Sequence, residues 1–298
     1  MKVAITGGTG FVGRALTRLL EHKGHEVIIL SRSRSQQQGN VTYINWLSND
    51  TRPEEYLEGI DAIVNLAGES INNGRWSEKQ KEKIYDSRMQ ATNEIIRIIG
   101  VLEQKPKVLI NASAIGIYPA SNERIYNERS TEKGHDFLAK TVADWEQKAS
   151  SAEEYGVQVA FGRFGIILGR TEGALPLMAL PYKMFVGGPI GKGDNWMSWI
   201  HVQDVANALL FAIENNIGGP FNVVAPDPKK MNEFSKTLAT VLKRPHYFPV
   251  PAFALKFALG EKSQLVLEGQ KVLPEVLIAA GFAFDFPDLE SALNDIYK

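Results

Sequence analysis

The chain contains no cysteine, and its 298 residues carry a formal net charge of only −1. Without cysteine, disulfides, a thiol nucleophile and thiolate metal sites are all excluded. The near-neutral balance gives no sign of a nucleic-acid or membrane partner. No apolar run is long enough to span a bilayer, and no basic-then-apolar leader opens the chain. We therefore expect a cytoplasmic protein with no metal site that acts on a small molecule.

The first half of the chain alternates short apolar runs with helical patterns. The runs predict strands at residues 2–6, 26–30, 41–45, 62–66, 107–112 and 158–163. The two longest helical patterns cover residues 77–103 and 135–155. Strands that alternate with helices favour a parallel sheet covered on both faces. The expected fold is therefore an α/β fold with a doubly wound parallel sheet of Rossmann type.

The second half has a different texture, because glycine and proline become frequent after residue 163. A helical pattern follows at 202–215, then a strand at 220–224 and a final helix at 288–297. We expect a nucleotide-binding domain formed by residues 1–165 and about 200–224. A smaller, mainly helical substrate-binding domain would comprise residues 166–199 and 225–298.

A glycine-rich segment lies between the first strand and the first helix, with glycines at positions 7, 10 and 13. In a dinucleotide-binding fold, Gly7 permits the tight turn and Gly10 allows the phosphates to approach the backbone. Gly13 allows the helix to pack against the strand. The helix N-terminus then offers unpaired N–H groups to the pyrophosphate. The predicted cofactor contacts in this segment are Gly7, Thr9, Gly10, Phe11, Val12 and Gly13.

The end of the second strand indicates which dinucleotide is bound. An acidic residue there would accept hydrogen bonds from the ribose 2′-hydroxyl of NAD, whereas a 2′-phosphate needs a cation. The chain has Ser31 and Arg32 followed by Ser33 and Arg34, with no acid. Arginine can donate two parallel N–H bonds to a phosphate. We therefore expect NADP(H) rather than NAD(H), held by Ser31 and Arg32 with help from Arg34.

Small residues at two further strand ends would let the backbone pass close to the cofactor. The predicted contacts here are Leu66, Ala67, Gly68, Glu69 and Ala112. By themselves, such residues are equally compatible with an ordinary turn after a strand.

Four segments occur in an order that resembles the extended short-chain dehydrogenase/reductase superfamily, which contains sugar-nucleotide epimerases and dehydratases. They are TGGTGFVG at 6–13, NLAG at 65–68, Asn111-Ala112-Ser113 and IHVQDVA at 200–206. Finer features are similar to a branch usually labelled epimerase family protein, which has its own C-terminal extension. These are Gly74-Arg75-Trp76, Ser87-Arg88, Phe137-Leu138-Ala139, Trp145-Glu146, MSWIH at 197–201, Val272-Leu273-Pro274 and Gly281-Phe282.

The resemblance implies a Tyr-x-x-x-Lys pair and a Ser or Thr that together move a proton while hydride passes to the nicotinamide. The expected pair is absent from this chain. Depending on the alignment, its positions fall on Leu138 and Val142, or on Asp136 and Lys140. The hydroxyl position falls on Ala114, and Ser113 lies one residue earlier.

Other side chains must therefore supply the proton chemistry if the protein is an enzyme. We predict Ser113, Tyr118 and Lys140 as the catalytic candidates, with His135, Asp136 and Glu69 as further possibilities. Arg75, Trp76, Arg88 and Trp199 are candidates for the substrate pocket. Arg88 interrupts an apolar helical stripe, so it either extends its charge to water or holds an anionic group.

Two functions remain open at this point. One is an NADP(H)-dependent oxidoreductase or epimerase-like enzyme with a rebuilt acid–base set. The other is a non-catalytic NADP(H) sensor or partner-binding protein. The long helices are compatible with a monomer or a homodimer.

Overall fold

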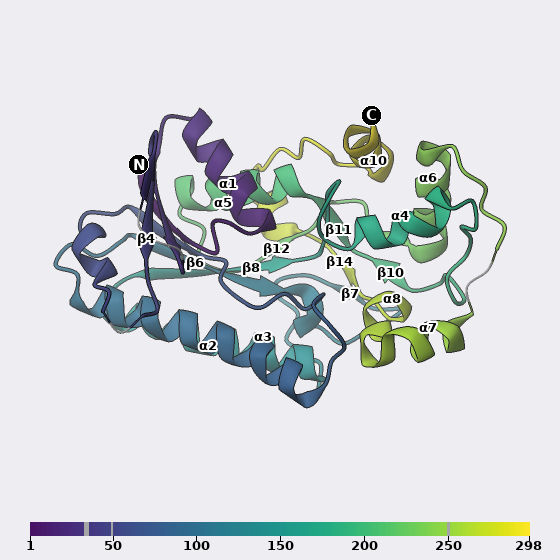
Figure 1. The fold of residues 1–298 in the computed structure, drawn as a ribbon, viewed down its shortest axis with the longest axis horizontal. Helices are drawn as coiled ribbons and strands as arrows, with labels where there is room; N and C mark the ends of the chain where they lie inside the picture. Colours follow the sequence, from purple (N-terminus) through teal and green to yellow (C-terminus); the bar gives the residue numbers. More distant parts are fainter. Residues whose placement is uncertain (33–35, 49, 249–250) are drawn as a thin grey trace.

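The computed structural model describes residues 1–32, 36–48, 50–248 and 251–298, except the side chains of residues 254, 258 and 259. Its main feature is an eight-stranded sheet in the order β12-β8-β6-β5-β1-β2-β4-β3 (Figure 1). Neighbouring strands are parallel except β3 and β4. The strands are β1 (Lys2–Thr6), β2 (Glu26–Ser31), β3 (Gln36–Gln38), β4 (Val41–Asn45), β5 (Ala62–Asn65), β6 (Val108–Ala114), β8 (Gln158–Phe164) and β12 (Gly219–Val223).

Helices cover both faces of the sheet, as a doubly wound fold requires. Helices α1 (Phe11–His22) and α5 (Val202–Glu214) lie on one face, and α2 (Glu78–Val101) and α3 (Phe137–Ser150) lie on the other (Figure 1). Alternate residues of the strands enter the two cores: Val27 and Ile29 pack with α1 and α5, whereas Ile28 and Leu30 pack with α2. Because both faces are buried, the strands read as continuous apolar runs. The predicted fold class is confirmed.

A third core lies at the other end of the molecule, where helices dominate (Figure 1). It is formed by α4 (Leu175–Lys183), α6 (Met231–Leu242) and α10 (Leu289–Tyr297) around the fully buried Trp199. Helices α7 (Ala252–Leu259) and α8 (Gln264–Leu267) also lie at this end, whereas α9 (Glu275–Ala279) packs against β12 in the core that contains α1 and α5. Short strand pairs link the two ends: β9 (Ile166–Leu168) with β11 (Trp199–His201), β10 (Trp196–Met197) with β13 (Lys229–Lys230), and β7 (Ile125–Tyr126) with β14 (Lys271–Val272).

Helix α4 lies in the proline-rich region, where the sequence pattern predicted no helix. Pro176 is in the first turn, where its missing N–H has no helical partner to lose. Pro181 lies inside the helix, and the carbonyl it leaves unpaired belongs to Leu177, a residue that is 68% exposed. Water can donate a hydrogen bond to that carbonyl, so the helix tolerates a proline at this position.

No helix in the described ranges is both long and apolar enough to cross a membrane. The division into a nucleotide-binding and a substrate-binding domain stays a prediction.

Candidate cofactor site

The turn between β1 and α1 has no room for side chains at two of its glycines. Gly7 has φ +66°, and a Cβ added there would lie 2.7 Å from the carbonyl oxygen of Leu66. A Cβ on Gly13 would lie 2.3 Å from the carbonyl oxygen of Gly7. Helix α1 begins after Gly10, which offers no side chain to cap the first amides. A closely packed turn with uncapped helical N–H groups fits a bound pyrophosphate.

A loop following β9 covers this turn from the other end of the molecule. The ring of Phe11 lies against Gly169, where an added Cβ would come within 2.4 Å of it. Arg14 donates to the carbonyl of Thr9 and pairs with Glu172. The first turn of α1 is therefore joined to residues 169–172, while Val12 packs against the core beneath.

A buried chain of polar side chains holds three strand ends at a fixed spacing. Asn65 accepts from the Thr6 hydroxyl at 2.7 Å and donates to Asn111 at 2.6 Å. Thr92 of α2 and Trp145 of α3 complete the chain. All the strand residues in it are fully buried, so their hydrogen bonds are made within the protein. The backbone at Leu66 and Ala67 is bonded to the same Thr6 hydroxyl. Ala112 follows Asn111 and is buried.

Arg88 lies over the backbone of Gly68, where an added Cβ would be 3.2 Å from the guanidinium carbon. One of its nitrogens donates to the carbonyls of Glu69 and Ile84 at 3.1 and 2.8 Å. The guanidinium also stacks 5.1 Å from the ring of Trp145. Burial lowers the pKa of Arg88 to about 10. With a pKa of about 10, Arg88 is a cation at neutral pH. Among the described residues, no carboxylate forms an ion pair with it.

The carboxyl end of β2 has the composition expected for a phosphate site. Ser31 is buried and Arg32 is exposed, and Asn45 donates to the Arg32 carbonyl at 3.2 Å. Glu69 follows β5, and its carboxylate accepts from Asn73 at 2.8 Å. That hydrogen bond is the main reason why the pKa of Glu69 is below its usual value. Ser33 and Arg34 lie outside the described residues.

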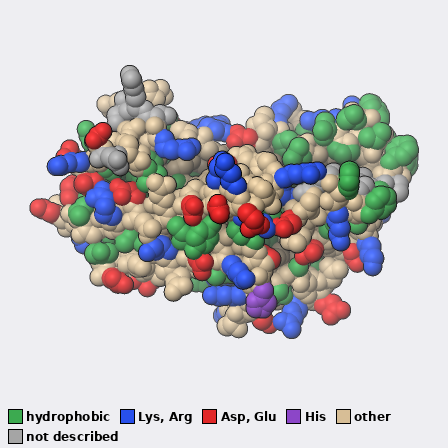
Figure 2. Space-filling view, turned by 60° about the horizontal axis from the view of Figure 1, so that its bottom comes forward, with side chains coloured by type: hydrophobic (Ala, Val, Ile, Leu, Met, Phe, Trp, Pro, Cys, Tyr) green, Lys and Arg blue, Asp and Glu red, His purple; other side chains and the backbone are tan. Residues whose placement is uncertain are grey.

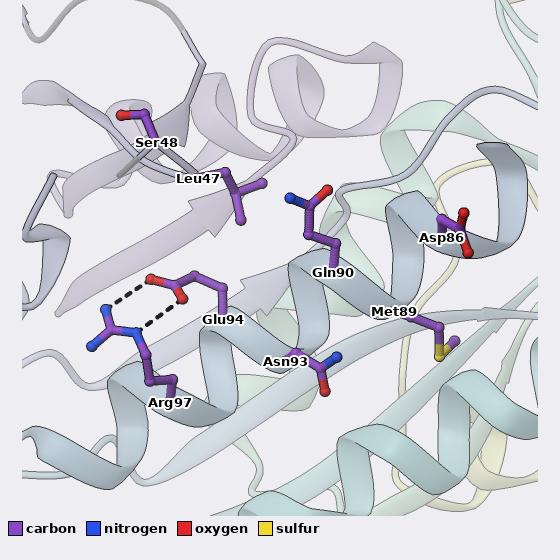
Figure 3. A pocket seen from close by; sticks show the side chains of 8 residues that line it. All are labelled: Leu47, Ser48, Asp86, Met89, Gln90, Asn93, Glu94 and Arg97. Carbon is purple, nitrogen blue, oxygen red and sulfur yellow. Dashed lines mark hydrogen bonds and ion pairs between the residues drawn. The ribbon is translucent and has the colours of Figure 1, made fainter. Parts of the chain in front are cut away.

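A polar-lined cavity of about 770 Å³ lies between the segment after β4 and helix α2 (Figure 3). Leu47 and Ser48 form one side of it, and Gln90 points toward Leu47 from α2. Leu47 has φ +59°, in the left-handed region that branched side chains rarely adopt. At the far end of the cavity Arg97 pairs with Glu94 at 2.7 Å.

The end of β6 leads into a second buried network, which the sequence patterns did not predict. Ser113 donates to Glu146 of α3 at 2.6 Å. Arg163 of β8 donates two parallel hydrogen bonds to the same carboxylate, each 2.8 Å long. Although burial opposes it, these bonds raise the pKa of Arg163. Arg163 and Glu146 thus form a buried ion pair that is hydrogen-bonded to Ser113, one of the predicted catalytic residues.

Tyr118 belongs to this same network. Its hydroxyl accepts from Arg163 at 2.9 Å and bonds to the side-chain oxygen of Asn222 at 3.0 Å. The ring stacks on Tyr126 at 5.2 Å and is 1% exposed. Burial raises the pKa of Tyr118, so the phenol is neutral at physiological pH.

Comparisons with known proteins identify the family. The model of the "NAD dependent epimerase/dehydratase family" matches residues 3–224, and a domain of unknown function (DUF1731) matches residues 250–296. The chain belongs to this epimerase/dehydratase family. The epimerase family protein YfhF of Bacillus subtilis is 49% identical over 298 residues, covering 99% of this chain and 98% of its own. A Staphylococcus haemolyticus epimerase family protein is 44% identical over 98% of this chain and 97% of its own.

Solved structures agree with that assignment. The human epimerase family protein SDR39U1 (isoform 2), solved with NADPH, has a TM-score of 0.89 and 35% identity, covering 100% of this chain and 99% of its own. A nucleoside-diphosphate sugar epimerase from Corynebacterium glutamicum has a TM-score of 0.80 and 33% identity. It is covered over 58% of its length, against 100% of this chain. The predicted resemblance to the epimerase branch is confirmed.

In this member of the epimerase family, the remaining predicted side chains are spread over three locations. Lys140 and His135 are exposed at the start of α3, and Asp136 caps that helix by accepting from the amides of Leu138 and Ala139. Trp76 is buried, with its ring edge against Phe137.

The other two pocket candidates lie farther along the molecule. Arg75 is exposed and donates to the carbonyl of Phe257 in α7, at 3.3 Å. Trp199 is fully buried in the third core and donates to the Asp227 carbonyl. Helices α4 and α6 pack around it.

Proposed function

We propose that this protein is an NADP(H)-dependent oxidoreductase or epimerase-like enzyme that acts on a small molecule. The observation that carries the proposal is the turn at Gly7–Gly13, where a Cβ has no space and the helix amides are uncapped. The family match and the NADPH-bound human relative support the same class of cofactor. When bound, NADP(H) supplies a hydride donor or acceptor.

Different residues of this chain would contact different parts of the cofactor. The turn would hold the pyrophosphate, and Leu66, Ala67, Gly68 and Ala112 would lie along the dinucleotide. Ser31 and Arg32 would bind the 2′-phosphate, with Arg34 as a helper. The cavity beside Leu47 adjoins this end of the sheet and would receive the adenine.

The proton chemistry needs a different residue from the missing tyrosine. Ser113 and Tyr118 are hydrogen-bonded to Glu146, Arg163 and Asn222, which supports a structural role for both. Lys140 is the exposed member of the three catalytic candidates. We therefore propose Lys140 as the proton-transferring group, with Arg75, Trp76 and Arg88 at the edge of the substrate site.

The choice of cofactor is tested with Arg32→Ala. Only NADPH carries the 2′-phosphate, so the variant should bind NADPH about 10- to 100-fold more weakly, as expected for loss of a charge-assisted bond. Its affinity for NADH should be unchanged. Calorimetry with both nucleotides measures this, and exposed Arg52→Ala is the matched control. Equal losses for the two nucleotides would contradict the assignment.

Catalysis is tested by mixing the NADPH-loaded protein with panels of carbonyl compounds and sugar nucleotides in single-turnover experiments. Oxidation of NADPH by at least one compound, lost in Lys140→Ala but kept in Lys133→Ala, supports the proposed enzyme. No oxidation across broad panels would contradict it.

A non-catalytic NADP(H) sensor is the second candidate. The burial of Ser113 and Tyr118 favours it, because a protein without a proton relay can still bind the cofactor. A partner captured equally at every NADP/NADPH ratio would contradict the sensor.

A further inference from the structure

Apolar side chains are concentrated at the helical end of the molecule. Of the fifteen large apolar side chains that are exposed in the described residues, nine fall in two short segments, 177–186 and 247–257. Figure 2 shows apolar side chains gathered toward one end of the surface. The nine are Leu177, Leu180, Met184, Phe185, Val186, Tyr247, Phe248, Phe253 and Phe257. Exposed apolar residues gathered in this way mark interaction sites, whereas scattered ones need no explanation.

The two segments lie against each other and form one surface. The amides of Tyr247 and Phe248 donate to the carbonyl of Gly187 at 3.0 and 3.2 Å. Tyr182 and His246 stack with their ring centroids 5.9 Å apart. We call the nine apolar side chains and the cations among them the α4–α7 surface.

The first turn of α7 continues this surface, because a Cβ on Gly191 would lie 3.9 Å from that of Ala252. Phe253 and Phe257, spaced four residues apart on one face of α7, are 76% and 87% exposed. A phenylalanine pair left almost entirely in water makes α7 an unpartnered helix face.

Within the two segments that form this surface the charges all have one sign, and the exposed acids Asp194 and Glu261 come directly after them. Residues 174–193 and 242–260 contain no aspartate or glutamate. The same two segments carry five cations: Lys183, Lys192, Lys243, Arg244 and Lys256. The four lysines are exposed, and Arg244 stacks 4.4 Å from the ring of Phe185. At the end of α7, the carboxylate of Glu261 is paired with Lys81 at 2.7 Å.

We propose that the α4–α7 surface binds the surface of an anionic phospholipid bilayer. Aromatic and aliphatic side chains enter the boundary between headgroups and acyl chains, while lysines and arginines contact the anionic headgroups. Lysine and arginine stems extend over apolar surface and leave their charges at the interface. The protein rests on the bilayer through this surface and does not span it.

The charge pattern argues against a second copy of the chain as the occupant. In a two-fold symmetric dimer the same patch meets itself, so five cations would face five cations without a carboxylate from the partner's patch. The net charge of −1 conceals this local excess, because carboxylates elsewhere on the chain balance it.

Vesicle sedimentation tests the proposal. The full-length protein should bind vesicles of phosphatidylcholine with 30% phosphatidylglycerol and not vesicles of phosphatidylcholine alone. Binding should fall at least tenfold between 0.1 and 0.5 M salt, because screening shortens the reach of each charge. The double variant Phe253→Ser/Phe257→Ser should lose at least tenfold in affinity. Its matched control, Val101→Ser/Ile125→Ser, changes two side chains of equal 55% exposure outside the surface and should bind normally.

The charge contribution is tested separately. Lys183→Gln/Lys243→Gln/Lys256→Gln should weaken binding by roughly fivefold per lysine. Lys23→Gln/Lys79→Gln/Lys133→Gln, which removes three exposed lysines elsewhere, should not. Calorimetric NADPH binding in every variant shows that the chain is folded. Absence of vesicle binding, equal binding to both vesicle types, or a dimer that the phenylalanine variant dissociates would each overturn the proposal.

Discussion

The carboxyl edge of the sheet has two halves that use their polar groups in opposite ways. At the ends of β1 and β2, the amides of the glycine turn are uncapped and Arg32 is exposed. At the ends of β6 and β8, Ser113, Glu146 and Arg163 are buried and bonded to one another. The first half has donors available for the proposed cofactor, and the second uses its donors in bonds within the protein. Binding and stability should therefore respond separately to changes in the two halves.

The largest effect on the first half should come from Gly13→Ala. The new Cβ would lie 2.3 Å from the Gly7 carbonyl oxygen, so either the turn or α1 must move. We expect NADPH affinity to fall more than 100-fold and stability to fall by about 3 kcal/mol, measured by calorimetry and urea unfolding. Gly24→Ala is the control: its φ is +75° with open space around it, so it should cost about 1 kcal/mol through backbone strain and leave binding intact.

Glu146→Gln disrupts the buried ion pair of the second half, because it leaves Arg163 buried without its anion. Loss of one partner of a buried ion pair typically costs about 3–5 kcal/mol. NADPH affinity per folded molecule should change less than about twofold. The exposed Glu132→Gln, which removes a surface pair with Arg124, should cost under about 1 kcal/mol. If Glu146→Gln abolished NADPH binding while remaining stable, the separation of the two halves would be wrong.

Tyr118→Phe should have a smaller effect in the same half. It removes a hydroxyl that accepts from Arg163 and bonds to Asn222, at a cost of about 1–2 kcal/mol in urea unfolding. Tyr126→Phe is the control, since its ring stacks on Tyr118. A loss of hydride transfer in Tyr118→Phe without a loss of stability would restore Tyr118 as a catalytic residue.

The smallest expected effect is a pH-dependent one at Glu128, beside the same network. Its Oε1 accepts from the amides of Asn222 and Val276, but its buried Oε2 has no partner. Burial raises the pKa of Glu128, so the folded state holds the proton more tightly than the unfolded state. Its contribution to stability is therefore present at low pH and lost as pH rises above its usual pKa.

Glu128→Gln removes that dependence. Relative to wild type, the variant should gain stability between pH 4 and pH 7, by under about 1 kcal/mol, as followed by thermal unfolding at a series of pH values. Exposed Glu132→Gln is the control. A stability difference that shrinks with rising pH would contradict this account.

The sequence was sufficient to predict the sheet and the glycine turn because both depend on local rules. Buried parallel strands give apolar runs, and a turn without room for Cβ requires glycine. Strand β4 was predicted at its observed bounds, Val41–Asn45. The edge strand β3, with three exposed glutamines, has no apolar pattern and could not be recognised.

The buried network was beyond prediction for a different reason. Glu146 and Arg163 are 17 residues apart, on a helix and a strand that meet only in the folded chain. Each by itself looks like an ordinary charged residue, although each interrupts an apolar pattern. Such an interruption indicates that a charge is buried, but the pairing depends on tertiary structure. The same is true of Trp199, whose burial follows from the packing of α4 and α6.

The chain of amides and hydroxyls from Thr6 through Asn65 to Asn111 has a consequence for the conditions under which the site keeps its shape. Neither an amide nor an aliphatic hydroxyl gains or loses a proton across the physiological range. Had carboxylates or histidines filled these positions, acidification would have changed the repulsion between neighbouring strands. The separation of the three strand ends is therefore insensitive to acid, and the candidate cofactor site should keep one width as the pH changes.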